Sequence, residues 1–203
     1  MFEARGQLRA ELRKRRNELD GAARFAAARA VAEHLDDIPG YVAARRVAGY
    51  WAIGGELPLS SVVAALDRDE ARTFLLPTVP TGKRGKLAFS PWHVGEAVEA
   101  NRFGIPEPIA TELLEGSSLD VVLLPVVAFD RQGHRLGTGG GYYDRTFAFR
   151  QATSPPPLLI GIAFACQEVD SIEVAAWDVD LDWVVTEREA IECVSRRSQA
   201  WTR

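Results

Sequence analysis

The residues best suited to chemistry lie in one stretch of the chain, DRQGHRLGTGGGYYDR, at residues 130–145. Gly137, Gly139, Gly140 and Gly141 allow the backbone to adopt positive φ and to approach a ligand closely. A helix expected over residues 141–151 would present unpaired N–H groups at its start, a geometry that binds phosphate. The alternative is a glycine-rich hairpin without a ligand, and the glycines alone do not decide between the two.

Two familiar phosphate motifs do not fit this sequence. A P-loop requires a glycine, four residues and then Gly-Lys-Ser/Thr, and neither Gly82 nor Gly85 has the upstream glycine or the hydroxyl. A dinucleotide-binding fingerprint that begins at Gly137 has Tyr142 in place of its third glycine and does not follow directly from a strand. A phosphate site here would therefore be of another kind.

Tyr142, Tyr143 and Asp144 follow the glycines directly and would place two aromatic rings and a carboxylate beside a bound phosphate. Aspartate is a hard oxygen ligand that suits Mg²⁺, which usually takes one or two carboxylates together with phosphate oxygens. This pattern indicates a nucleotide with magnesium. The alternative is that Asp144 caps the helix or pairs with Arg145 while the tyrosines pack in the core.

Arg5 and Arg9 are four residues apart on one face of an expected first helix, so both guanidinium groups could bind one polyphosphate. A solvated basic face is the alternative. Basic residues crowd the N-terminus while Asp and Glu dominate from Glu168 onward, and we expect these two parts of the chain to face each other.

Glu56 follows Gly54 and Gly55 at the end of an expected strand that also carries Trp51. Because the carboxyl ends of strands line the binding crevice of open α/β sheets, both residues are candidates for ligand contact. Helix capping by Glu56 and core packing of Trp51 are the alternatives.

Helical and extended patterns alternate along the chain, which favours a mostly parallel sheet with helices on both faces. The first helix carries Leu8, Leu12 and Leu19. The second is capped by Asp20, carries Phe25, Ala28, Ala32 and Leu35, and ends at Pro39 and Gly40. Further helices are expected at 58–67 and 141–151, an irregular segment at 101–108, and strands at 46–53, 73–76, 86–92, 119–129, 158–163 and 181–186.

Composition excludes several classes of protein. The 203 residues, 47% of them hydrophobic and 26% charged, suffice for a packed core, and we expect a single domain over residues 1–203. The net charge of −4 gives no general attraction to nucleic acid or to an anionic membrane, so neither is expected as a partner. No apolar run is long enough to span a bilayer, and the charged first sixteen residues do not resemble a secretory signal.

Cys166 and Cys193 are far apart and form no metal-binding or CxxC pattern, so neither a disulfide framework nor a zinc site is indicated. A soluble protein of the reducing cytoplasm fits best. The three histidines share no metal-site spacing, and no Gly-x-Ser-x-Gly elbow or Cys/His pair supports covalent catalysis.

The chain resembles the 5-formyltetrahydrofolate cyclo-ligase family. The resemblance includes the basic-x-x-Leu-Arg pattern that ends at Arg9, together with Glu56 and Pro77. It is most specific in LPVVAFDRQGHRLGTGGGYYDRTF (124–147), and it also covers NRFGIPEP (101–108), IGIAFACQ (160–167) and WDVDLDWVVTE (177–187).

This resemblance implies a three-layer α/β/α, Rossmann-like fold with a mostly parallel central sheet. It also implies ATP-dependent closure of 5-formyltetrahydrofolate to 5,10-methenyltetrahydrofolate, with Mg²⁺ as cofactor and ATP as co-substrate. The implied catalytic residues are Arg9, Arg135, Tyr143 and Asp144, and the implied metal ligands are Asp144 and Asp178. ATP contacts are carried over to Arg5, Arg9, Arg135, Leu136, Gly137, Thr138, Gly139, Gly140, Gly141, Tyr142 and Tyr143, and folate contacts to Trp51, Glu56, Phe103, Thr138, Gly139, Gly140, Gly141 and Tyr142.

Three positions depart from the pattern of the family. Arg5 stands where many relatives have lysine, which changes the geometry of a phosphate contact. Gly140 stands where some relatives have lysine, so Arg135 or Arg145 would supply the missing cation. Trp177 precedes Asp178 where a polar residue is common, which makes the second metal ligand less secure than the first.

Two other functions remain as alternatives. One is a non-catalytic nucleotide- or folate-binding protein, and the other is a sugar-phosphate isomerase or acyl-transfer enzyme on a related sheet. The small molecules 5-formyltetrahydrofolate and ATP are the expected partners, and a monomer is the expected state, with a weak homodimer as the alternative.

Overall fold

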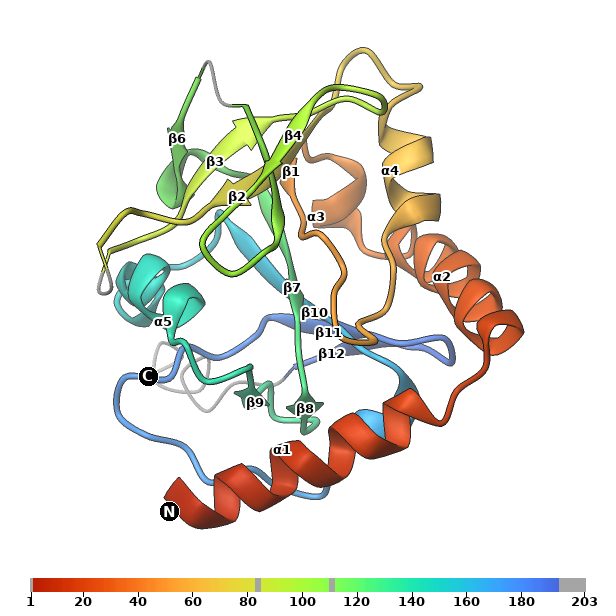
Figure 1. Cartoon of the computed structure of the whole chain (residues 1–203), viewed down its shortest axis with the longest axis vertical. Helices are drawn as coiled ribbons and strands as arrows, with labels where there is room; N and C mark the ends of the chain where they lie inside the picture. Colours follow the sequence, from red (N-terminus) through yellow and green to blue (C-terminus); the bar gives the residue numbers. More distant parts are fainter. Residues whose placement is uncertain (1, 83–84, 110–111, 194–203) are drawn as a thin grey trace.

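The computed structural model describes residues 2–82, 85–109 and 112–193. Its centre is an eight-stranded sheet with the order β12-β11-β10-β7-β1-β2-β3-β6 (Figure 1). The five strands from β11 to β2 run parallel, and β12, β3 and β6 pair antiparallel at the two edges. The strands are β1 (Arg46–Ala48), β2 (Thr73–Thr78), β3 (Ala88–Pro91), β6 (Leu114–Glu115), β7 (Val121–Pro125), β10 (Leu158–Ile162), β11 (Trp183–Val185) and β12 (Ala190–Glu192).

Helices cover both faces of the sheet, as expected (Figure 1). On β7, Val121 and Leu123 pack in the cluster that contains α2 and α4, while Val122 and Leu124 pack with Phe147 on the opposite face. This alternation arises because successive side chains of a strand point to opposite faces. One face carries α2 (Gly21–Leu35), α3 (Pro39–Val42) and α4 (Ser60–Leu66), and the other carries α5 (Tyr142–Thr146) and the 3₁₀-helix η2 (Ala148–Gln151). The three-layer α/β/α architecture is thereby confirmed.

The first helix, α1 (Phe2–Asn17), lies across the carboxyl ends of the parallel strands (Figure 1). Its Leu12 is fully buried against Val127, Ala128 and Leu136, in the segments that follow β7. These segments form the small ribbon of β8 (Ala128–Phe129) and β9 (Arg135–Leu136). Helix α1 is therefore packed directly against the hairpin that leads into the glycine run.

The second expected helix begins where the sequence predicts and ends earlier. Asp20 is its N-cap, and the Asp20 Oδ1 accepts a hydrogen bond from the N–H of Ala23 at 2.7 Å. The helix ends at Leu35, and Pro39 begins the short helix α3 instead of acting as the stop, in keeping with the fixed φ that suits proline to a first helical turn. Of the apolar residues expected on this helix, Ala28 and Leu35 are buried, whereas Phe25 is 64% exposed.

Three other predicted elements are shorter or divided. The expected helix over residues 141–151 is split into α5 and η2, and the expected strand 46–53 ends at Ala48. The expected strand 119–129 divides after Pro125, where the Gln167 Nε2 donates to the carbonyls of Val126 and Val127 at 2.7 and 2.9 Å. The side chain of Gln167 thus satisfies backbone carbonyls that a neighbouring strand would otherwise bind. The segment expected to be irregular contains β5 (Pro106–Pro108), paired with β4 (Val98–Ala100).

None of the helices in the described ranges is both long and apolar enough to cross a membrane.

Candidate active site

A cavity of about 780 Å³ opens at the carboxyl ends of the parallel strands, between α1, the loop after β1 and the glycine run. Fifteen of the sixteen residues predicted for the site line this cavity, although they come from distant parts of the sequence. They are Arg5, Arg9, Trp51, Glu56, Phe103, Arg135, Gly137, Thr138, Gly139, Gly140, Gly141, Tyr142, Tyr143, Asp144 and Asp178.

Leu136 is the exception. Its side chain is fully buried against Leu12 and Val127, and its carbonyl accepts a hydrogen bond from the Val127 N–H at 2.7 Å. The side chain of Leu136 therefore cannot contact a ligand in the cavity. It holds the ribbon beneath α1 and so places the glycine run that follows.

The glycine run is open toward the cavity. Gly139 and Gly141 have φ of 107° and 64°, a region that favours glycine. Among the described residues, the backbone N–H groups of residues 137–141 have no hydrogen-bond partner. Helix α5 is only five residues long, so these loop donors, rather than a long helix dipole, would bind an anion.

Arg9 reaches this loop from α1, and its Nε donates to the Gly137 carbonyl at 2.8 Å. Arg9 also lines the cavity. Burial lowers the pKa of Arg9, and the neighbouring positive charges of Arg5 and Arg13 lower it further. A cation in this electropositive position is stabilised when an anion binds beside it.

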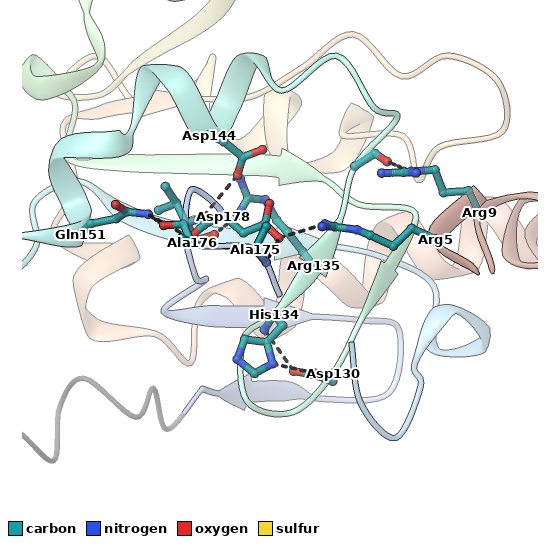
Figure 2. A network of polar contacts seen from close by, with 12 residues as sticks. Arg5, Arg9, Asp130, His134, Arg135, Asp144, Gln151, Ala175, Ala176 and Asp178 are labelled. Atoms are coloured by element: carbon teal, nitrogen blue, oxygen red, sulfur yellow. Dashed lines mark hydrogen bonds and ion pairs between the residues drawn. The ribbon is translucent and has the colours of Figure 1, made fainter. Parts of the chain in front are cut away.

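Arg135 joins the loop to the opposite wall of the cavity (Figure 2). It is 8% exposed and donates to the Asp144 Oδ1 at 2.7 Å and to the carbonyl of Val179. The same Asp144 oxygen accepts from the N–H of Val179 at 3.3 Å. Asp144 thus pairs with Arg135, and the alternative of a pair with Arg145 is wrong.

Arg5 and Asp178 connect the two ends of the chain (Figure 2). The Arg5 Nη2 lies 2.9 Å from the Asp178 Oδ2, which also accepts from the N–H of Ala175 at 2.9 Å. The basic first helix and the acidic later part of the chain therefore meet, as their charges predict. Neither Arg5 nor Arg9 belongs to a freely solvated helix face.

Asp130 fixes the turn before Arg135. It is fully buried, and its carboxylate accepts from the N–H groups of Gln132, His134 and Ile172 at 2.9 to 3.0 Å. The His134 Nδ1 lies 2.8 Å from the Asp130 Oδ2 (Figure 2). His134 therefore belongs to the support of the ribbon.

The donor set fits a magnesium ion that is bound together with phosphate. Asp144 and Asp178 line the same cavity, and their hydrogen bonds use one carboxylate oxygen of each. Within the described residues, no group of three or more His, Cys, Asp or Glu side chains could hold a metal ion alone. Mg²⁺ commonly completes its six-coordinate shell with water and phosphate oxygens, so two carboxylates suffice beside a polyphosphate.

The cavity is also lined by a buried carboxylate, Glu56, which is 9% exposed. Its Oε2 accepts from the N–H of Ile53 at 3.1 Å, and helix α4 has Leu59 at its N-cap, so Glu56 does not cap that helix. Burial raises the pKa of Glu56, while the Ile53 hydrogen bond and the positive charge of Arg16 oppose that shift.

Two arginines that sequence reasoning missed hold the turn before Glu56. The Arg16 Nη2 donates to the Gly54 carbonyl at 2.7 Å, and the Arg24 Nη1 donates to the Gly55 carbonyl at 2.8 Å. Both glycines have positive φ. The signal was available, because residues 5, 9, 12 and 16 recur on one face of a helix, with the buried Leu12 between the arginines.

Aromatic rings surround the cavity near Glu56. Trp51 packs edge-on against Trp92 with ring centroids 5.6 Å apart, so it belongs both to the edge of the core and to the cavity wall. Phe103 is 55% exposed and meets Tyr142 at 6.1 Å. The guanidinium carbon of Arg145 lies 4.7 Å from the centroid of the same Tyr142 ring.

Tyr143 packs on Phe147 with nearly parallel rings whose centroids are 6.4 Å apart. Burial raises the pKa of Tyr143, and the charge of Glu56 raises it further. Its hydroxyl therefore remains protonated, which makes it unsuited to act as a base. Sequence reasoning also did not assign the cavity-lining residues Tyr50, Ile53, Val79, Leu87, Ile105, Pro125, Ala148 and Gln151 to the site.

The fold and cavity together define an α/β protein with one cavity at the carboxyl ends of its parallel strands, lined by arginines, a glycine run, aromatic rings and a buried carboxylate. The model of the 5-formyltetrahydrofolate cyclo-ligase family matches residues 1–187. This chain belongs to that family.

Individual relatives agree with the family match. The 5-formyltetrahydrofolate cyclo-ligase of Haemophilus influenzae is 32% identical over 179 residues, which are 87% of this chain and 94% of the relative. That of Escherichia coli K12 is 35% identical over 177 residues, covering 86% and 96%. The structure of Aquifex aeolicus 5,10-methenyltetrahydrofolate synthetase matches with a TM-score of 0.78 and 28% identity, covering 93% of this chain and 92% of that one. The Mycoplasma pneumoniae synthetase, at 20% identity and a TM-score of 0.67, supports the fold.

Proposed function

We propose that this chain converts 5-formyltetrahydrofolate to 5,10-methenyltetrahydrofolate and, in doing so, converts ATP to ADP and phosphate. Family membership supports the reaction. The single structural observation that supports it best is the cavity itself, which joins four arginines and the glycine run to Glu56 and a set of aromatic rings.

The reaction needs an activated formyl oxygen. The oxygen of a formamide is a poor leaving group, so transfer of the γ-phosphoryl group of ATP to that oxygen precedes ring closure. N10 of the folate then attacks the formyl carbon and loses its proton, and the carbon–oxygen bond breaks with release of phosphate. The former formyl oxygen leaves in that phosphate.

Neither step requires a nucleophile from the protein. Cys166 does not line the cavity, and burial raises the pKa of Cys193 to about 12, which keeps its thiol unreactive. Catalysis of phosphoryl transfer depends chiefly on positioning and on stabilising charge. Cations and backbone donors are the groups that this cavity offers.

In this proposal Arg5, Arg9 and Arg135 and the N–H groups of residues 137–141 bind the phosphates of ATP. Asp144 and Asp178 would hold Mg²⁺, which neutralises phosphate charge when bound. Arg145 also lines this end, and its contacts are the carbonyls of Gly85 and Gly140 and the ring of Tyr142. It is the cation best placed to substitute for the lysine that some relatives have at position 140.

The pterin of the folate would lie at the other end. Trp51, Phe103 and Tyr142 supply aromatic faces on which a planar ring system packs well. Glu56 accepts hydrogen bonds from ring N–H groups. The protonated hydroxyl of Tyr143 lies near both Glu56 and the phosphate end, where it can donate to the transferring group.

We also infer that the protein acts on small molecules, as a monomer, in a reducing cytoplasm. Cys166 and Cys193 are both free thiols in the structure, which suits such a compartment. The net charge of −4 likewise offers no general attraction to nucleic acid.

An absorbance assay tests the proposal. Purified protein mixed with 5-formyltetrahydrofolate and MgATP should produce the absorbance of the methenyl product, and omission of any one component should abolish it. Release of ADP should require the folate. A protein that binds both ligands without forming the chromophore would be the non-catalytic binder, and turnover of a sugar phosphate would indicate the isomerase alternative.

A further inference from the structure

Trp177 is a large aromatic side chain in an unusual position. It is 61% exposed, yet it lines the cavity. Among the described residues, Trp177 packs against no other aromatic ring, whereas Trp51 and Trp92 pack on each other. A bare indole face on the wall of a ligand cavity is typical of a surface on which a planar ligand stacks.

The turn that carries Trp177 is held rigidly in place. The Gln151 Nε2 donates to the carbonyls of Ala176 and Asp178, one on each side of Trp177, at 3.1 Å each (Figure 2). The Asp178 carboxylate accepts from the N–H of Ala175, and the Asp178 N–H donates to the Ala175 carbonyl. A fixed backbone lowers the entropy lost when the ring orders a ligand.

Trp177 stands at the phosphate end of the cavity. The next residue, Asp178, pairs with Arg5, one of the proposed phosphate-binding cations, and both line the cavity. Adjacent Cα atoms are about 3.8 Å apart, so the side chains of residues 177 and 178 can serve one ligand. A ligand with a planar heterocycle and a polyphosphate needs these two kinds of group side by side.

We propose that Trp177 stacks on the adenine ring of ATP and so selects a nucleoside triphosphate over a bare polyphosphate. This inference rests on the proposed use of ATP and adds the site of the base to it. Stacking of a base on an aromatic side chain does not require a particular hydrogen-bonding pattern. Trp177 would therefore increase the affinity for a nucleotide without selecting strongly among different bases.

Calorimetric titration with MgADP and with magnesium tripolyphosphate tests the proposal. Trp177→Ala should weaken MgADP binding by about tenfold and leave tripolyphosphate binding unchanged, while Trp177→Phe should keep most of the ADP affinity. Phe25→Ala, which removes an equally exposed ring on α2, is the matched control and should change neither titration.

Fluorescence gives a second readout that needs no loss of affinity. MgADP should quench the tryptophan emission of the unaltered protein, and the quenching should largely disappear in Trp177→Phe. Equal ADP affinity in Trp177→Ala, or equal weakening of ADP and tripolyphosphate, would overturn the stacking role. Absence of ADP binding to the unaltered protein would instead contradict the proposed function.

Discussion

Arg5 and Asp178 are 173 residues apart in the sequence, and their side chains form an ion pair of 2.9 Å in the wall of the cavity. Both side chains are only 12 to 13% exposed, so the charges are poorly screened by water. The pair fastens α1 to the turn at residues 175–178. It therefore fixes the position of α1, which carries the proposed phosphate-binding residues Arg5 and Arg9, relative to the proposed metal ligand Asp178.

The proposed metal site predicts that Asp144→Asn lowers turnover far more than it lowers folding stability. Asparagine keeps the shape and one acceptor but loses the charge, so we expect the apparent affinity for Mg²⁺ to fall by about tenfold or more. Turnover measured against magnesium concentration, with a melting curve, checks this. Asp37→Asn, an exposed carboxylate in the turn after α2 that does not line the cavity, is the control. An unchanged magnesium dependence would contradict the assignment.

Arg9→Ala should weaken ATP binding. The loss of one charge-assisted contact to phosphate costs about 1.5 to 3 kcal/mol, or roughly 10- to 150-fold in affinity. Titration with MgADP measures the effect. Arg13→Ala removes a similar charge one turn further along α1 but does not line the cavity, and it should cause a much smaller change. Equal effects of the two variants would mean that Arg9 acts only through its charge at a distance.

The raised pKa of Glu56 predicts that the free energy of unfolding depends on pH. Because burial raises its pKa above the ordinary value of 4.5, the folded state binds the proton more tightly than the unfolded state. The stability contributed by Glu56 is thus fully present below pH 4.5 and is lost as the pH rises through the raised pKa. Relative to Glu56→Gln, the free energy of unfolding of the unaltered protein should decrease over that window. Chemical denaturation at several pH values measures this difference, and a constant difference would contradict the raised pKa.

The hydrogen bonds from Arg16 and Arg24 to the turn before Glu56 should affect folate binding but not nucleotide binding. Arg16→Gln removes the donor to Gly54 and the charge that favours ionised Glu56, so the affinity for 5-formyltetrahydrofolate should fall. The acidic limb of its binding profile should also move to higher pH, since the pKa of Glu56 rises. Affinity for MgADP should change little. Arg15→Gln, an exposed arginine of the same helix, is the control, and a parallel loss of ADP affinity would show that Arg16 merely supports α1.

Local sequence signals predicted the elements of the fold that depend on local chemistry. Asp20 marks the start of α2 because an N-cap interaction lies within four residues, and the apolar run of β7 indicates a strand that is buried on both faces. The break after Pro125 was not predictable, because it depends on Gln167, which is 42 residues away.

The site was predictable to the extent that its residues form motifs. The stretch from Arg135 to Asp144 is continuous, so its members were found together. The ion-pair partner of Asp144 was not predictable, because both Arg135 and Arg145 are close to it in the sequence. Only the fold of the β8–β9 ribbon brings Arg135 into contact with Asp144. Arg16 shares a helix face with Leu12, Arg9 and Arg5, and this spacing could have indicated it, but an arginine on a basic helix is usually solvated and so was not assigned to the site.

We propose that the triphosphate of ATP lies between α1 and the glycine run. Backbone ¹H–¹⁵N NMR of the protein with and without MgADP tests it most directly, since the loop N–H groups are the proposed donors. The largest shifts should fall on Gly137, Thr138, Gly139, Gly140 and Gly141, and Arg9→Ala should reduce them. Shifts confined to other parts of the chain, with these five amides unmoved, would contradict the account.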